Sequence, residues 1–126
     1  MERMVTVGDR MIKMRASALI PRLYRFKFGR DMISDMAALK KAFDKAKNLP
    51  SDATPEEREA AQLSAFDLTI FENAAYIMAK HADASQPNTP DEWLEQFDMF
   101  SIYQVLPQML ELWNINNMTT SIPKKK

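Results

Sequence analysis

The chain of 126 residues has no cysteine, a single histidine and only two glycines. Without cysteine it can form neither a disulfide framework nor a thiolate metal site, which agrees with a reducing cytoplasm. Two glycines supply few turns of positive φ, which disfavours an all-β fold, and they cannot build a phosphate-binding loop. No apolar run approaches the roughly 20 residues of a membrane span, and no signal-peptide-like stretch opens the chain. We therefore expect no membrane partner.

The charges cancel in sum but are unevenly distributed along the chain. Residues 1–50 hold twelve Lys/Arg against five Asp/Glu, a balance of +7, whereas residues 51–121 hold two against twelve, a balance of −10. The last three residues are all lysine and restore a net charge of zero. Oppositely charged surfaces favour binding to a second copy or to another charged protein. This split describes surfaces rather than a catalytic pocket, so we do not expect an enzyme.

What the chain has in abundance is good helix formers, chiefly Ala, Leu, Met, Glu and Lys. An apolar share of 46% is enough for one folded core. The predicted fold class is mainly α: a small helical domain over residues 1–115, with a long central helix and a short N-terminal β-hairpin at about residues 5–14. The hairpin is predicted because apolar and polar residues alternate in part around the turn dipeptide Gly8-Asp9. Residues 116–126 are expected to form a flexible polar tail ending in three lysines.

The segment at residues 19–28 allows two interpretations, helix or strand. Ser17 can cap a helix whose apolar face would run through Leu19, Leu23 and Phe26. The alternation of residues 24–28 also fits a strand, so the choice stays open, although the longer apolar face favours helix.

The next helix is more strongly indicated. Gly29 suits a position just beyond the end of the first helix, and Asp31 can cap a second one that runs to about Lys47. Its apolar residues recur at intervals of four, three and four, which predicts one buried stripe. The stripe consists of Met32, Met36, Leu39 and Phe43.

Two Thr-Pro-acid-Glu sequences mark later helix starts, at residues 54–57 and 89–92. The first is followed by an apolar pattern without Gly or Pro to about Ala82, which predicts one helix of 28 residues and about 42 Å. A last helix is predicted to start at Ser101, with Gln104 completing a capping box. Pro107 lies inside this helix and is expected to kink or shorten it.

No catalytic, cofactor-binding or metal-binding residue is predicted, and no cofactor is expected. His81 is the only histidine and has no second histidine or cysteine nearby in sequence. Asp67 and Glu72 interrupt the long apolar pattern, but their spacing of five does not place them on one helix face. The acidic residues at the helix starts are explained by the helix dipole.

The basic run of residues 22–30 supports an alternative function, that of a small nucleic-acid-binding regulatory protein. Four cations alternate there with three aromatic side chains, a pattern that can contact phosphates and stack on bases. The neutral total charge and the acidic later segment count against nucleic acid as the main partner. The cations are Arg22, Arg25, Lys27 and Arg30, and the aromatic residues are Tyr24, Phe26 and Phe28.

Three stretches together carry a resemblance to a known family. They are Ile-Pro-Arg-Leu-Tyr-Arg-Phe-Lys-Phe-Gly-Arg-Asp at residues 20–31, Phe-Glu-Asn-Ala-Ala-Tyr-Ile-Met-Ala-Lys at 71–80, and Pro-Asp-Glu-Trp-Leu-Glu-Gln-Phe at 90–97, which leads to Trp113. The chain resembles tail assembly chaperones of long, non-contractile-tailed (siphovirus-type) phages and prophages of Gram-positive bacteria. The resemblance covers about residues 10–126 and consists of apolar and aromatic positions rather than catalytic motifs.

The resemblance implies a non-enzymatic morphogenesis factor that acts in the host bacterial cytoplasm and is absent from the mature virion. Such chaperones bind and solubilise the tape measure protein and help to recruit tail tube protein. Many copies along one client would favour weak homo-oligomerisation. The family often makes a longer product by programmed ribosomal frameshifting, and the codons of Lys124–Lys126 could supply an A-rich slippery sequence. A solubilising basic tail explains the same lysines equally well.

Overall fold

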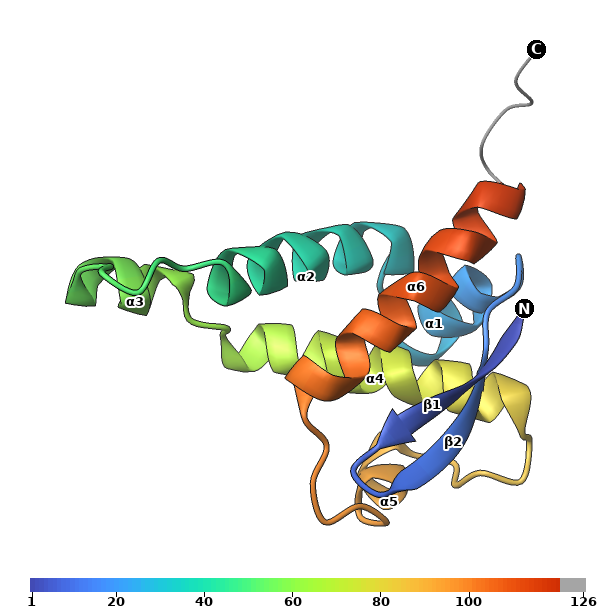
Figure 1. Cartoon of the computed structure of the whole chain (residues 1–126). Helices are drawn as coiled ribbons and strands as arrows, with labels where there is room; N and C mark the ends of the chain where they lie inside the picture. Colours follow the sequence, from blue (N-terminus) through green and yellow to red (C-terminus); the bar gives the residue numbers. More distant parts are fainter. Residues whose placement is uncertain (121–126) are drawn as a thin grey trace.

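The computed structural model describes residues 1–120. For residues 115–120 it describes the backbone alone. The elements follow in the order β1 (Glu2–Val7), β2 (Arg10–Arg15), α1 (Ile20–Phe28), α2 (Met32–Lys47), α3 (Pro55–Ala61), α4 (Ala65–Ala82), α5 (Pro90–Leu94) and α6 (Ile102–Thr120). Helix α4 runs through the middle of the molecule, with α2 along one side of it and the hairpin on the other (Figure 1). The predicted mainly α fold with an N-terminal hairpin is confirmed.

The hairpin is antiparallel and slightly longer than predicted. Val5 lies opposite Ile12 across the two strands, and Gly8 takes a φ of 62° in the turn. Because successive strand residues face opposite sides, this register places one apolar face against α4 and the other face toward solvent. The buried residues are Val5, Val7, Ile12 and Met14.

Helix α6 covers the free edge of β1 with two glutamine side chains. The amide of Gln108 accepts a hydrogen bond from the Thr6 N–H at 2.9 Å and donates one to the Thr6 carbonyl at 3.0 Å. The side-chain amide of Gln104 likewise accepts from the Gly8 N–H at 2.7 Å and donates to the Gly8 carbonyl at 3.4 Å. An uncovered strand edge leaves backbone groups unpaired, and here side-chain amides take the place of a third strand.

Two predictions about α6 are corrected by these contacts. Gln104 makes its side-chain hydrogen bonds with the hairpin turn, where it had been predicted to pair with Ser101 in a capping box. The helix also continues through Pro107 to Thr120, so the predicted shortening is wrong. It thereby extends into the segment expected to be a tail, and the remainder of that tail, residues 121–126, lies outside the described residues.

Residues 20–28 form helix α1, which settles the choice between helix and strand. The N-cap is Leu19, so the prediction of Ser17 as the cap is wrong; the Ser17 hydroxyl is hydrogen-bonded to His81 Nε2 at 2.9 Å. Gly29 ends the helix with a φ of 68°, and its N–H donates to the Arg25 carbonyl at 2.7 Å, as predicted for a left-handed cap.

Helix α2 agrees with the prediction at its start, its end and its buried stripe. The Asp31 side chain accepts from the Ile33 N–H at 3.1 Å, and all four residues of the predicted stripe are buried. The unexpected buried residue is Asp35, which is only 7% exposed. Arg30 donates to both oxygens of its carboxylate at 2.8 Å, and the Tyr24 hydroxyl donates to one of them at 2.8 Å. These bonds fasten the end of α1 to the start of α2.

The predicted long central helix is present as α4, but its predicted start at Pro55 is wrong. Thr54 and Glu57 form the expected capping box of α3, and residues 62–64 then separate this short helix from α4. A second capping box starts α4: the Asp67 N–H donates to the Ser64 hydroxyl and the Ser64 N–H donates to the Asp67 carboxylate, both at 3.0 Å. Local hydrogen bonding therefore ends one helix and begins another without Gly or Pro.

The C-terminal part of the core is aromatic. Thr89 caps the short helix α5 as predicted, by accepting from the Glu92 N–H. Trp93 is fully buried in this helix, and its ring lies within 6.0 Å of the Tyr76, Phe97 and Phe100 rings. This cluster anchors the irregular segment between α4 and α6.

Candidate docking groove

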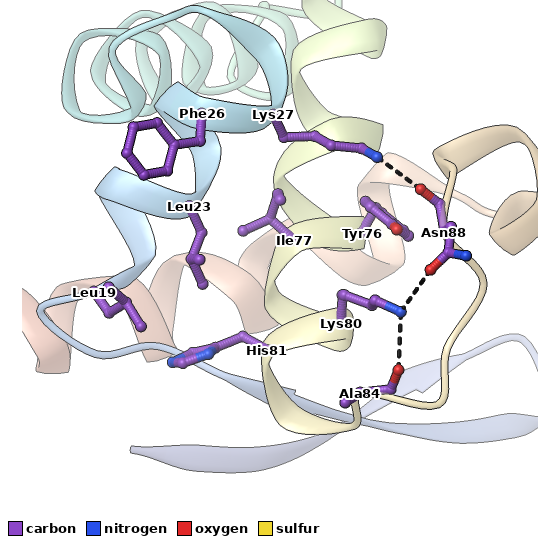
Figure 2. A pocket seen from close by; sticks show the side chains of 10 residues that line it. All are labelled: Leu19, Leu23, Phe26, Lys27, Tyr76, Ile77, Lys80, His81, Ala84 and Asn88. Atoms are coloured by element: carbon purple, nitrogen blue, oxygen red, sulfur yellow. Dashed lines mark hydrogen bonds between the residues drawn. The ribbon is translucent and has the colours of Figure 1, made fainter.

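An open apolar groove lies between α1 and the C-terminal half of α4 (Figure 2). It has a volume of about 720 Å³. Leu23 and Ile77 line it from the two helices, while Leu19 and Phe26 stand at its rim and are 46% and 69% exposed. The predicted apolar face of α1 is therefore the face that borders this groove, and the neighbouring residues Ile20 and Tyr24 are the buried ones.

The loop after α4 forms one wall of the groove and is fastened by two lysines. Lys80 donates to the carbonyls of Ala84 and Gln86 at 2.9 Å and 2.6 Å, and to Asn88 Oδ1 at 3.2 Å. Lys27 of α1 reaches across and donates to the Asn88 carbonyl at 2.7 Å (Figure 2). The wall is thus held from both helices that flank the groove.

The groove lining contains two lysines and no carboxylate. His81 also lines it, and burial lowers the pKa of this imidazole, with further lowering from Arg15 and the N-terminal ammonium group and an opposing effect of Glu2. His81 is therefore neutral at pH 7. Arg22 lies beside the rim with its guanidinium 4.6 Å from the centroid of the Phe26 ring. An apolar site is thus bordered by positive charge.

Part of the basic and aromatic pattern at residues 22–30 is engaged within the fold. Arg30 is engaged with the buried Asp35, and Lys27 holds the loop wall. Tyr24 is fully buried, so it cannot stack on a base. Only Phe26 offers an exposed ring in this segment, which leaves little of the expected pattern of accessible aromatics.

Few ion pairs connect the basic and the acidic parts of the chain within residues 1–114. Within residues 1–114, the only ion pair that joins the basic and the acidic parts of the chain is Arg3 with Glu111. The other two pairs, Arg30 with Asp35 and Lys40 with Asp44, lie inside the basic part. Intramolecular pairing therefore does not account for the separation of charge.

No three His, Asp or Glu side chains of the described residues gather where they could hold a metal ion. Glu72 is partly buried, and burial together with the nearby Asp91 raises the pKa of its carboxyl group, but it does not line the groove. None of the described helices is long and apolar enough to cross a membrane.

Comparison with protein-family models, with curated proteins and with solved structures found no match for this chain. The resemblance to tail assembly chaperones therefore stays a prediction. The structural features that bear on function are the groove, its exposed apolar rim and the positive charges beside it.

Proposed function

We propose that this protein is a tail assembly chaperone of a siphovirus-type phage or prophage. It binds the tape measure protein, keeps it soluble and helps to recruit tail tube protein, without catalysing a reaction. It acts in the host cytoplasm and does not enter the mature virion. The sequence resemblance supports this proposal, and the observation that carries it is the open apolar groove between α1 and α4 with Phe26 exposed at its rim.

A groove between two helices suits a helical client. An amphipathic helix can lay its apolar face against Leu23 and Ile77 while it covers Leu19 and Phe26. Fully burying a Phe side chain contributes about 1.5–3 kcal/mol, so covering the exposed part of Phe26 is worth about 1–2 kcal/mol. One such site binds weakly, and a long client that engages many copies gains avidity from their number. Weak individual sites therefore fit a chaperone that coats an extended helical protein.

Co-expression with the client tests this function directly. The tape measure reading frame expected beside this gene is expressed alone, with the wild-type protein, and with the Phe26→Ser variant. We expect the client to be soluble only with the wild type, because the variant removes the largest exposed apolar contact of the groove. Met99→Ser is the matched control, since Met99 is 73% exposed but lies outside the groove. A client whose solubility does not depend on this protein would overturn the proposal.

A further inference from the structure

We infer that the groove between α1 and α4 selects an amphipathic helix with acidic side chains along the flanks of its apolar stripe. This inference deepens the proposed function and rests on it only in treating the groove as the client site. It starts from the charges around the groove, which the apolar lining alone does not explain.

Two of the cations at the groove, Lys27 and Lys80, are held by neutral oxygens. Within residues 1–114 no ion pair engages Arg22, Lys27 or Lys80. Lys27 and Lys80 donate to carbonyl and amide oxygens, which orient an ammonium group without cancelling its charge. At the His81 end, Arg15 and the N-terminal ammonium each act more strongly on the imidazole than the carboxylate of Glu2 does. A bound acidic group would therefore meet the positive charge of Lys27 and Lys80, whose ammonium groups already donate to the loop, and it could pair directly with Arg22, which has no ion pair within residues 1–114.

Helix stability explains some of these cations but not all of them. Lys27 and Lys80 lie in the last turns of α1 and α4, where positive charge is favourable to the helix dipole. Arg22 is the third residue of α1, where a cation opposes the dipole and costs about 0.3–1 kcal/mol. Its guanidinium nevertheless lies over the Phe26 ring, at the exposed rim of the groove. Arg22 is therefore the cation for which a role in binding has the strongest case.

The dimensions of the rim indicate a short helical segment. Phe26 follows Leu19 by seven positions, so the apolar rim is about 10 Å long, or two helical turns. Ligand pockets enclose about 70–90% of a small molecule, whereas this groove is open and Phe26 at its rim is 69% exposed. A partner helix of two to three turns would cover the rim and place its flanking side chains beside Arg22 and Lys27.

Nucleic acid is the less suitable occupant of the same positive site. A phosphate backbone carries charge but no continuous apolar face, and it would leave Leu23 and Ile77 without a partner. A protein helix supplies both the apolar stripe and the carboxylates. The choice between the two is open to direct measurement.

Fluorescence anisotropy with three synthetic peptides of about 18 residues tests the inference. The first has a leucine stripe flanked by glutamates, the second has the same stripe flanked by lysines, and the third has the composition of the first in scrambled order. We expect the first to bind about tenfold more tightly than the second, and its advantage to shrink between about 50 and about 300 mM NaCl. Binding should be lost with the third.

Two variants locate the effect in the groove. Arg22→Glu should remove most of the preference for the acidic peptide, and it should not harm folding because an acidic residue is favourable in the first turn of a helix. Lys41→Glu makes the same charge change at an exposed position of α2 outside the groove and should leave the preference unchanged. Phe26→Ser should weaken binding of both striped peptides, whereas Ile33→Ser, a change at another exposed apolar residue, should not.

Three results would overturn the inference: equal affinity for acidic and basic helices, a preference that survives Arg22→Glu, or tighter binding of an oligonucleotide than of the acidic helix. These failures are distinguishable from a failure of the proposed function. If client solubility depends on Phe26 but no acidic preference exists, only the charge selection is wrong. If the peptides bind as expected but the tape measure protein does not respond, the groove serves a different acidic partner.

Discussion

Replacing Asp35 with alanine should destabilise the protein more than any other single change of a charged residue in α2. The substitution leaves the fully buried Tyr24 hydroxyl without its acceptor, which costs about 1–3 kcal/mol. Arg30 loses both of its bonds to Asp35, but its side chain is 44% exposed, so water replaces much of that pairing and the loss is about 0–1 kcal/mol. We expect a net loss of about 2–3 kcal/mol in the free energy of unfolding.

Urea unfolding followed by far-UV circular dichroism measures this loss. With a slope of about 1.5 kcal/mol per molar urea, the midpoint should fall by about 1.3–2 M while the slope stays unchanged. Asp44→Ala is the matched control, because it removes an exposed i,i+4 pair with Lys40 and should cost under about 0.5 kcal/mol. If Asp35→Ala costs no more than Asp44→Ala, the reasoning from burial is refuted.

The same carboxylate should make stability depend on acid. The hydrogen bonds from Arg30, assisted by Tyr24 and opposed by burial, lower the pKa of Asp35 below its ordinary value of 3.8. A group whose pKa is lower in the folded state stabilises the protein above its unfolded pKa, and this contribution is lost as the pH falls through the folded value. The difference in stability between the wild type and Asp35→Asn should therefore shrink below about pH 4. A constant difference down to pH 2 would contradict the assigned direction.

Four further measurements address other parts of the molecule. Gln108→Ala should lower the free energy of unfolding by about 1–2 kcal/mol, because Thr6 loses partners for both backbone groups; a loss as small as that of an exposed Gln62→Ala control would show that water replaces the amide. Gly29→Ala should cost about 1–2 kcal/mol from its positive φ alone, since an added Cβ meets nothing within 4 Å, and an unchanged urea midpoint would refute this. Ser64→Ala should cost about 1 kcal/mol and speed amide exchange in the first turn of α4, and equal exchange there would argue against the capping box. Self-association should weaken as salt is added, and sedimentation that shows a salt-independent monomer at high concentration would count against pairing of the oppositely charged surfaces.

The features that the sequence predicted well are those decided by near neighbours. Thr54 and Asp31 cap their helices because each side chain reaches backbone N–H groups two or three residues later. The stripe from Met32 to Phe43 is buried as its helical spacing requires. Gly8 and Gly29 were also predicted from their local context, the first in a turn and the second at a helix end, and both residues adopt positive φ.

The break before α4 was predictable in principle but was missed. Ser64 and Asp67 have the spacing of a capping box, and a search for Gly and Pro alone does not detect it. The continuous apolar pattern around this point outweighed that short polar signal.

Other features depend on tertiary contacts that periodicity does not contain. Tyr24 and Phe26 both belong to the aromatic pattern of α1, yet one is fully buried and the other is largely exposed. The difference arises from which side of α1 meets α2 and α4. Asp35 looks like a solvent-facing acid in sequence, and only the approach of Arg30 and Tyr24 makes its burial favourable. The groove could not be located for the same reason.

The glutamine contacts between α6 and β1 have a consequence for the order of events during synthesis. The residues they join are 96 and 102 positions apart in the chain. On the ribosome, the hairpin therefore emerges long before the helix that covers its edge, and β1 is open to pairing with other strands throughout that interval. Helix α6 is the last described element to be made, so the edge of β1 gains its hydrogen-bond partners only at the end of synthesis of the described residues.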